Sequence, residues 1–456
     1  MDWLTFSLYL GLVFVGYMMI YAVSFDDIRE MGLMRSPAGK QVIWIGISFA
    51  VFAVFQVIDW KFWQTFAYPV YGFTLLLLVA VLIFGVNING ATSWFRFGGF
   101  TIQPSEFAKF GAALAMAAYL STYKVDLRSW SQKGTALAIF LVPAMLILLQ
   151  PDAGSALVFM SFLLVLYREG LNPSYYWGGA FLTLSLILGL LISPVSMFIG
   201  LILIGLFVLI AQLEKKSFWY FGAGMITVGT IYLYQTGDYY TEILIVLASA
   251  YLVLLMVLYR RKVRQMMFPV TIAILIGGGV AYAANYAFNQ VLQPHQQDRI
   301  QVWLQPNEAD KQGSYYNIMQ SKLAISSGGL TGRGFLKGNM TKLNYVPMQS
   351  TDFIFCTVGE EQGFTGVLAL VILFLMFLFR ILKLAERQRS DFARIYAYGL
   401  LGILFIHFFI NIGMTMGIMP VIGIPLPFIS KGGSSLLGFT IMISVLLRMD
   451  KYRFRL

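Results

Sequence analysis

Cysteine, histidine and charge are scarce in this sequence of 456 residues. Its single cysteine, Cys356, excludes a disulfide framework and any metal or redox motif built on paired cysteines. Its two histidines, His295 and His407, lie far apart in the chain, which argues against a histidine metal centre. Charged residues make up only 12% of the chain, whereas ~25% is typical of soluble domains.

Apolar residues take the place of the missing charge: 59% of the chain is hydrophobic and 16% is aromatic. No soluble core could hide so much apolar surface, which excludes a water-soluble enzyme, a disordered regulator and a fibrous protein. The net charge of +11 does not indicate a nucleic-acid partner, because the basic residues recur in short clusters between apolar runs. That pattern is typical of loops facing anionic lipid. The sequence therefore predicts an all-α polytopic membrane protein.

Fourteen apolar runs have about the ~20 residues that a membrane-spanning helix needs. They lie near 3–24, 41–58, 67–86, 104–122, 134–150, 154–168, 174–192, 197–213, 218–236, 242–259, 267–290, 354–379, 392–417 and 433–449. Lysine and arginine concentrate in alternate connections, which become the cytoplasmic loops if the N-terminus is inside. Because the number of spans is even, we expect both termini in the cytoplasm.

The connection 291–353 is long and polar, and this topology places it outside the cell. Its recurring apolar residues predict short amphipathic helices at the membrane surface, with a disordered segment as the alternative. Its glycine-rich stretch SSGGLTGRG (326–334) could let backbone amides approach an anion. The outer surface is basic, with cations from this loop and one from the connection 87–99: Arg299, Lys322, Arg333, Lys337, Lys342 and Arg96.

Ionisable side chains inside membrane helices are costly and are therefore functional candidates. Glu106 and Lys109 are three residues apart on one predicted helix, so they can pair. They are either a structural ion pair or the lining of a polar cavity in which Lys109 binds a phosphate. Asp152, at an outer hairpin, is interpreted as a helix cap.

Three acids, Asp352, Glu360 and Glu361, lie near one helix entrance with no lysine or arginine between them. Such a group is expensive unless a cation, hydrogen bonds or a cavity relieves it. Asp352 is either the N-cap of the following helix or a reactive acid. An acid beside phosphate-binding cations at the outer leaflet fits a phosphate-bearing lipid better than an inorganic ion.

These segments resemble the SEDS family, and its rod-shape branch more than its division branch. The residues that carry the resemblance are ATSWFRFGGFTIQPSEFAK (91–109), LLQPDAGSAL (148–157), HQQDRIQVWLQP (295–306), QSKLAISSGGLTGRG (320–334), VPMQSTDFIFCTVGEEQGFTG (346–366) and NIGMTMGIMPVIGIPLPFISKGGSS (411–435). Two positions depart from the family pattern: Lys431 stands where a tyrosine is common, and Met348 where a glutamate often occurs.

The resemblance implies a peptidoglycan glycosyltransferase that polymerises lipid II into glycan strands at the outer face of the cytoplasmic membrane during elongation and cell-shape maintenance. It implies work with a class B penicillin-binding transpeptidase and other membrane proteins of the elongation complex. The family's essential acid falls on Asp352, its polar membrane pair on Glu106 and Lys109, and its loop arginine on Arg299. The candidates for substrate binding are Arg96, Glu106, Lys109, Arg299, Lys322, Arg333, Lys342, Glu360, Ser434 and Ser435.

The resemblance also implies a ten-helix core, so about four spans are extra. We interpret 174–259 as inserted helices, 1–173, 260–290 and 354–456 as the core, and 291–353 as the large extracytoplasmic loop. No tightly bound cofactor is expected, although a divalent ion, Mg²⁺ or Mn²⁺, could accompany the departing pyrophosphate. The alternatives are a flippase for the same lipid, a division-type polymerase, and a scaffold that positions a transpeptidase.

Overall fold

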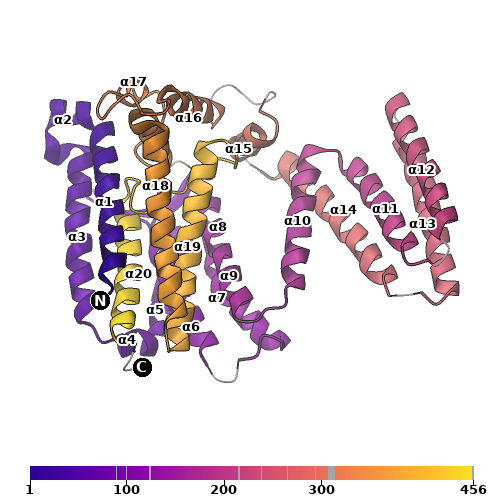
Figure 1. Cartoon of the computed structure of the whole chain (residues 1–456), viewed down its shortest axis with the longest axis horizontal. Coiled ribbons are helices and arrows are strands. Elements are labelled where there is room, and N and C mark those ends of the chain that lie inside the picture. Colours follow the sequence, from indigo (N-terminus) through magenta and orange to yellow (C-terminus); the bar gives the residue numbers. More distant parts are fainter. Residues whose placement is uncertain are drawn as a thin grey trace. The chain divides into compact units, whose positions relative to one another are not determined.

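A computed structural model describes residues 1–88, 90–98, 100–122, 125–213, 216–237, 239–263, 265–292, 294–306 and 314–453. Helices make up most of the described chain (Figure 1). The chain divides into two compact units, which are described separately. The first combines Met1–Leu171 with Asp310–Leu456, and the second is Asn172–Ala309.

The long helices of the first unit account for nine of the fourteen predicted spans. They are α1 (Trp3–Val23), α3 (Pro37–Val57), α5 (Ala67–Phe84), α6 (Pro104–Leu120), α7 (Trp130–Leu148), α8 (Ala153–Val158) continued by η2 (Phe159–Ser161) and α9 (Phe162–Arg168), α18 (Ile354–Glu386), α19 (Asp391–Thr415) and α20 (Gly433–Lys451). Its shorter helices are α2 (Phe25–Met31), η1 (Leu33–Arg35), α4 (Trp60–Thr65), α16 (Ser314–Ser327) and α17 (Asn339–Lys342).

The second unit holds the other five predicted spans and one short helix. They are α10 (Ser174–Leu191), α11 (Pro194–Ile210), α12 (Lys216–Thr236), α13 (Tyr240–Arg260), α14 (Met267–Gln290) and the short α15 (Pro294–Leu304). Across the described residues of both units, 10 helices are long and apolar enough to cross a membrane, and Ala153–Arg168 and Pro194–Ile210 are shorter apolar helices. The chain is thus a multi-pass membrane protein.

Capping residues explain where several of these helices begin. Asp2 accepts a hydrogen bond from the Thr5 backbone amide at the start of α1, and Ser36 does the same for Gly39 at the start of α3. Asp152 caps α8 through the Ser155 amide, which confirms its interpretation as a cap. Each cap satisfies one of the amides that a helix N-terminus leaves without a partner inside the helix.

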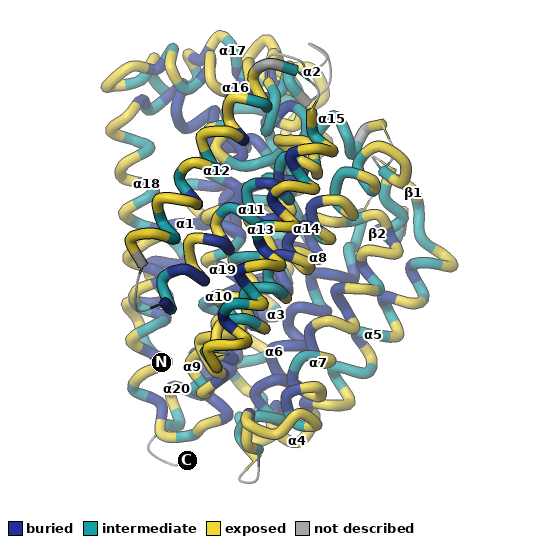
Figure 2. The backbone as a smooth tube through the Cα atoms, turned by 90° about the vertical axis from the view of Figure 1, so that its right-hand side faces the viewer, coloured by how far each residue is buried: buried dark blue, intermediate teal, exposed yellow. Residues whose placement is uncertain are grey.

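The core of the first unit lies around α6, α19 and α20. About 89% of the apolar stretch of α20 and 67% of that of α19 are buried, compared with 22% for α5 (Figure 2). Small residues allow this close packing. A side chain at Gly438 of α20 would contact the Glu106 backbone, which lies 3.3 Å away. This packing surrounds the Glu106–Lys109 pair with protein instead of lipid.

A small antiparallel sheet follows α5 and adds to the predicted helical architecture. Strand β1 (Val86–Ile88) pairs with β2 (Ala91–Phe97), which pairs with β3 (Phe100–Ile102). Gly90 and Gly98, with φ of 87° and 58°, lie in the two turns. Positive φ favours glycine, and such glycines between alternating residues are a hairpin signal. The sequence analysis predicts only a connection in this segment.

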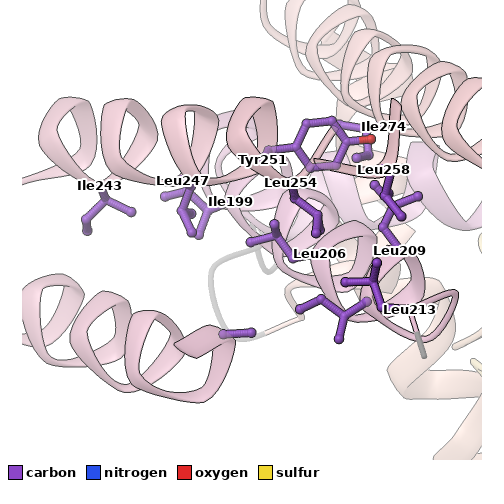
Figure 3. Packing of buried hydrophobic residues seen from close by; sticks show 12 residues of the cluster. Ile199, Leu206, Leu209, Leu213, Ile243, Leu247, Tyr251, Leu254, Leu258 and Ile274 are labelled. Atoms are coloured by element: carbon purple, nitrogen blue, oxygen red, sulfur yellow. The ribbon is translucent and has the colours of Figure 1, made fainter. Parts of the chain in front are cut away.

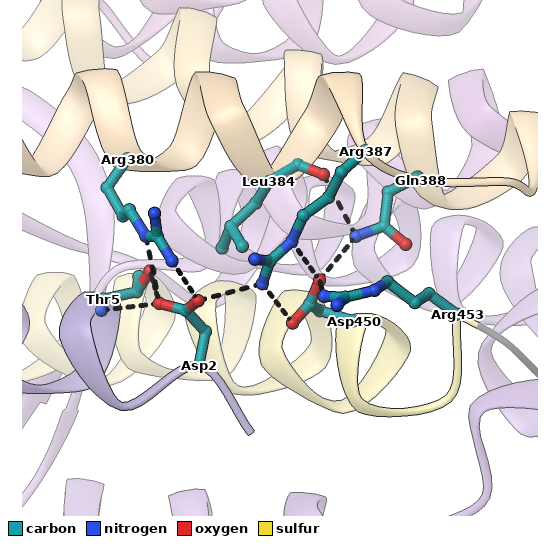
Figure 4. Close-up of polar contacts among 8 residues, drawn as sticks. All are labelled: Asp2, Thr5, Arg380, Leu384, Arg387, Gln388, Asp450 and Arg453. Carbon is teal, nitrogen blue, oxygen red and sulfur yellow. Dashed lines mark hydrogen bonds and ion pairs between the residues drawn. The ribbon is translucent and has the colours of Figure 1, made fainter.

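Ionic contacts join the N-terminus, the end of α18 and the end of α20 (Figure 4). Arg387 lies 2.9 Å from Asp2 and 2.6 Å from Asp450, and Arg380 also pairs with Asp2. Burial would raise the pKa of the Asp2 carboxyl, but hydrogen bonds from Arg380, Thr5 and Arg387 hold it well below its usual range. The Asp2 carboxylate is therefore ionised near neutral pH. We call Asp2, Arg380, Arg387 and Asp450 the inner clamp.

Further contacts join the ends of helices that border the predicted inner loops. Arg448 at the end of α20 donates to the backbone carbonyls of Val57 and Ile58 at the end of α3. Arg168 lies 2.9 Å from Glu386, and Arg394 lies 3.1 Å from Glu169. At the opposite end of the unit, α16 and α17 lie across the top of α18, away from both marked termini (Figure 1). The grouping of loops agrees with the predicted alternation, and which face is cytoplasmic stays a prediction.

The second unit has an apolar core of its own (Figure 3). Leu206 and Leu209 of α11 pack with Leu247 and Leu254 of α13, and Ile274 of α14 joins them. Helix α14 also packs closely against α10, since a side chain at Gly189 would overlap Ala281. The structure thus groups α14 with α10–α13, whereas the sequence interpretation assigns 260–290 to the core.

The predicted helices of the 291–353 connection are α15, α16 and α17, which confirms helical structure in that loop. Residues 307–313 of the connection lie outside the described residues. The position of these helices at a membrane surface stays a prediction.

Candidate functional site

Asp352 lies in a tight turn at the entrance of α18. The turn is closed by the backbone amides of Thr351 and Phe353, which both donate to the carbonyl of Met348. Met348 itself has a φ of 61°, an uncommon value for a residue with a side chain. The N-cap of α18 is Phe353, which makes no side-chain capping bond. Asp352 is therefore one residue before the N-cap, and capping does not explain its position.

Backbone hydrogen bonds attach this turn to the irregular segment 416–432 between α19 and α20. The Asn411 amide donates to the carbonyl of Asp352 at 2.8 Å and to that of Ile424 at 2.7 Å. The Lys431 amide donates to the carbonyl of Ser350 at 2.9 Å. Asn411 is fully buried, and its two bonds satisfy carbonyls that no helix or sheet serves. The acid is thus fixed between α18 and α19.

The Asp352 carboxylate is half-buried and points toward Gly423. A β-carbon placed on Gly423 would lie 3.4 Å from its Oδ2, and Gly423 has a φ of 76°. A glycine at this position allows both the left-handed backbone and the close approach of the acid. The carboxylate therefore faces the segment 416–432 and is not directed along the axis of α18.

Two cations approach the same segment. Lys322 of α16 is exposed, and its Nζ would lie 2.6 Å from a β-carbon at Gly417. Ser321 beside it donates to the Thr415 carbonyl at 2.9 Å, which fixes α16 to the end of α19. Burial and the nearby charge of Lys40 lower the pKa of Lys431. The segment thus carries Lys431 on its own backbone and Lys322 against its first turn.

Glu106 and Lys109 form the predicted ion pair. Lys109 Nζ lies 2.8 Å from Glu106 and 2.9 Å from His407 Nε2, and it lies 4.9 Å from the centre of the Phe439 ring. His407 Nδ1 lies 3.0 Å from the Pro425 carbonyl, which can only accept, so Nδ1 carries the proton. Nε2 then accepts from the Lys109 ammonium. Since Lys109 is only 1% exposed, the geometry favours the structural interpretation of the pair.

Glu360 is fully buried and anchors the connection 291–353 to α18. Its carboxylate accepts from the backbone amides of Met340 and Thr341 at 2.8 Å, and from the Thr341 hydroxyl at 2.7 Å. The residues that bind it are the first turn of α17. These bonds explain how an acid is tolerated in that helix. The predicted contact of Glu360 with substrate is untested.

Helix α18 is broken at Gly363, which has a φ of 65° and a ψ of −164°. The glycine-rich stretch 328–334 crosses the break. The amides of Arg333 and Gly334 donate to the carbonyls of Glu360 and Glu361, and the amides of Phe364 and Thr365 donate to the carbonyls of Gly329 and Leu330. These four bonds span 2.9–3.1 Å. These backbone groups thus form hydrogen bonds to residues on both sides of the break in α18. From the sequence, the glycines suggest an anion-binding site instead.

The remaining predicted site residues lie on separate elements. Arg96 is exposed on β2, Arg333 and Lys337 are exposed in the loop after α16, and Lys342 is exposed at the end of α17. Ser434 and Ser435 are buried in the first turn of α20. Arg299 lies on α15 of the second unit. Contact of these residues with a substrate stays a prediction.

Sequence reasoning missed His407, Asn411 and Gly423. His407 was considered only as a metal ligand, although a histidine and an asparagine four residues apart in an apolar helix share one face. Polar side chains inside a membrane helix need partners, so this pair indicated backbone or charged groups beside α19. The signal was present, but its partners come from segments that are distant in sequence.

Comparisons with known proteins agree with this architecture. A family model for FtsW, RodA and SpoVE, described as "Cell cycle protein", matches residues 2–199 and 208–454. Because the match leaves out only 200–207 of the segment 174–259, it gives the insertion hypothesis no support. A chain from a structure described as "Structural coordination of polymerization and crosslinking by a peptidoglycan synthase complex" superimposes with a TM-score of 0.65 at 24% identity, covering 100% of this chain and 98% of that chain.

Two curated relatives match nearly the whole chain. The peptidoglycan glycosyltransferase RodA of Treponema pallidum (strain Nichols) is 30% identical over 451 residues, which are 98% of this chain and 96% of the relative. The peptidoglycan glycosyltransferase MrdB of Escherichia coli (strain K12) is 30% identical over 441 residues, 96% of this chain and 90% of the relative. The resemblance to SEDS proteins is thereby confirmed, and the chain belongs to the FtsW, RodA and SpoVE family.

Proposed function

We propose that this protein is a peptidoglycan glycosyltransferase that polymerises lipid II at the outer face of the cytoplasmic membrane during elongation. The proposal rests on the half-buried Asp352, whose backbone carbonyl accepts from Asn411 and whose carboxylate faces the segment 416–432. That segment contains Lys431, and Lys322 of α16 lies against it. Two relatives named as peptidoglycan glycosyltransferases support the reaction class. The proposed orientation puts both termini in the cytoplasm.

Asp352 has the position of a general base. Glycan extension requires an acceptor hydroxyl to attack the anomeric carbon of a sugar that leaves with a lipid pyrophosphate. A carboxylate within hydrogen-bond reach takes the proton of that hydroxyl in the transition state. Direct displacement of this kind inverts the anomeric carbon. The lipid chain enters between helices, and the sugar lies under the extracytoplasmic loop.

Cations stabilise the negative charge that develops on the departing pyrophosphate. The candidates in the first unit are Lys322, which lies against the segment 416–432, Lys431 of that segment, and Arg333. A part for Arg299 stays a prediction from the family resemblance. Lys109 is bonded to Glu106 and His407, so its part is to hold α6, α19 and the segment 416–432 together. A flippase would need polar groups spread across the bilayer, whereas the candidate cations Lys322, Arg333 and Lys342 all come from the single connection 291–353.

The proposal assigns no step to a metal ion. Among the described residues, no group of three histidine, cysteine, aspartate or glutamate side chains could hold one. A divalent ion brought by the pyrophosphate stays an expectation. A class B penicillin-binding transpeptidase is the proposed partner, supported by the likeness to a chain whose structure is described as a peptidoglycan synthase complex.

Glycan synthesis from purified lipid II, with and without the transpeptidase, tests the proposal. The Asp352→Asn protein keeps shape and hydrogen bonding but cannot accept a proton. We expect its rate to fall by about 10²–10⁴-fold, as for loss of a general base, with unchanged melting temperature and partner binding. Asp26→Asn, an exposed acid in α2, is the control and should retain activity. Near wild-type polymerisation by Asp352→Asn would exclude Asp352 as the base.

A further inference from the structure

An apolar cavity of about 520 Å³ lies between α1 and α18 in the first unit. Phe14, Met18 and Met19 line it from α1, Val358, Ala369 and Leu373 are among the lining residues of α18, and Phe335 closes it from the loop. Gln362 is its one polar side chain. The volume is within the ~300–1,000 Å³ of small-molecule sites.

The inner clamp holds α1 and α18 together beyond Leu373, the last residue of α18 that lines the cavity. Arg380 and Arg387 bind the N-terminus of α1 through Asp2, and a β-carbon placed on Gly11 would lie 3.9 Å from the Leu373 side chain. Phe335 lines the cavity from the connection between α16 and α17. The lining of α18 from Val358 to Leu373 extends ~22 Å by helical rise.

Two positively charged residues lie close to Phe335 along the chain. Arg333 and Lys337 are both exposed and flank Phe335 by two residues on either side. Arg333 is fixed by its backbone amide, which donates to the Glu360 carbonyl at 3.0 Å. An apolar cavity between two membrane helices, with two exposed cations two residues from the lining residue Phe335, matches one hydrocarbon chain and one anionic headgroup.

We propose that this cavity binds one acyl chain of an anionic phospholipid, with the lipid phosphate at Arg333 and Lys337. The cavity is distinct from the surroundings of Asp352, because Asp352 faces the segment 416–432 and the cavity is lined by α1, α18 and Phe335. Arg333 is the one residue of the proposed lipid site that is also a candidate cation for the polymerase reaction. Its depth favours a single acyl chain, since a polyisoprenyl carrier would extend far beyond it. Such a lipid fills the cavity and contacts α1 along residues 14–19, beside the break in α18.

Photocrosslinking of the full chain tests the site. The protein is reconstituted in phosphatidylcholine vesicles containing a phosphatidylglycerol probe with a diazirine in its acyl chain, and the labelled peptides are identified. We expect labels within 14–19 and 358–373. Ala369→Trp fills the cavity and should lose most of this labelling. The control Ile372→Trp, on an exposed position of the same helix that does not line the cavity, should label like wild type.

Two further arms distinguish the headgroup and the source. Arg333→Gln with Lys337→Gln should weaken labelling by phosphatidylglycerol and leave that by an equivalent phosphatidylcholine probe unchanged. Unlabelled phosphatidylglycerol should compete with the probe, and polyisoprenyl phosphate at equal concentration should not. Equal labelling of Ala369→Trp and Ile372→Trp, or competition by polyisoprenyl phosphate alone, would overturn the proposal.

Discussion

Lys109 illustrates how a single charge is accommodated inside the bundle. Its ammonium has Glu106, the neutral nitrogen of His407 and the face of Phe439 around it. Cations are attracted to aromatic faces as well as to acceptors, so the charge is stabilised from three directions. His407 extends the network to the Pro425 carbonyl, and through it the pair on α6 supports the segment that faces Asp352.

We predict that removing one member of the pair is more harmful than removing both. Lys109→Ala leaves the Glu106 carboxylate buried, and stranding a buried charge costs roughly 3–5 kcal/mol. The double replacement with Glu106→Ala removes the stranded charge and should recover part of that loss. Thermal unfolding of the purified protein in detergent, analysed as a double-mutant cycle, measures the coupling.

Asp391 and Arg394 provide the matched control for this cycle. They have the same three-residue spacing and lie 2.8 Å apart, but their side chains are 59% and 33% exposed. Exposed pairs typically contribute only ~0–1 kcal/mol, so Asp391→Ala should scarcely change the melting temperature. Additive effects at Glu106 and Lys109 would contradict a direct interaction between them.

Asn411 is predicted to act as a positioning residue for Asp352. Asn411→Ala leaves the carbonyls of Asp352 and Ile424 without their donor, and each unsatisfied buried group costs about 1–3 kcal/mol. We expect kcat for glycan synthesis to fall while KM for lipid II changes little, because the acid shifts and the cations do not. A fall in stability with unchanged kcat would assign Asn411 to the fold alone.

At the scale of elements, the break in α18 is the feature that most needs support from another segment. Unpaired backbone groups are expensive at membrane depth, and the four hydrogen bonds from the stretch 328–334 satisfy those freed at Gly363. Glu360 attaches α17 to the same part of α18. The connection 291–353 is therefore a structural part of the helix that presents Asp352.

Gly363→Ala should be strongly destabilising. A side chain there combines a positive φ, which costs roughly 1–2 kcal/mol in a residue with a β-carbon, with overlap of the Gly332 amide. Gly329→Ala is the matched control, because it also has a positive φ of 57° but no atom within 4 Å of an added β-carbon. Melting temperatures of the two variants measure the difference, and equal values would argue against the observed crossing.

At the scale of the whole molecule, the first unit separates its polar contacts into two ends. The inner clamp and the arginine contacts of Arg168, Arg394 and Arg448 gather the ends of α1, α3, α9, α18, α19 and α20. The contacts of Asp352, Ser321 and Lys431 gather the opposite connections. The two sets correspond to the loops that were assigned to opposite sides of the membrane by their charge.

Cysteine labelling can assign the two ends to sides of the membrane. The native Cys356 is buried, so it contributes little background. In intact cells an impermeant maleimide should label Lys337→Cys, which is at the outer end, and should leave Arg389→Cys unlabelled until the membrane is opened. Labelling of Arg389→Cys alone would reverse the proposed orientation.

Apolar run length, capping residues and loop charge are local properties, and for that reason the fourteen helical runs, the cap at Asp152 and the grouping of loops were predictable. The spacing of Glu106 and Lys109 also predicted their pairing, because neighbours on one helix face meet without help from other elements. The family resemblance depended on short motifs in order along the chain. These features needed no knowledge of which helices are neighbours.

Contacts between distant segments could not be predicted in this way. His407 meets Lys109 across 298 residues, and Asn411 reaches Asp352 across 59. The stretch 328–334 looked like an anion site because its glycines allow close backbone approach, and only packing against Gly363 showed that the approaching group is another backbone. Packing also placed Glu360 under α17 and turned Asp352 toward Gly423. A polar residue in an apolar run can be predicted from the sequence to need a hydrogen-bond partner. Which group becomes that partner depends on the packing of segments that are distant in the sequence.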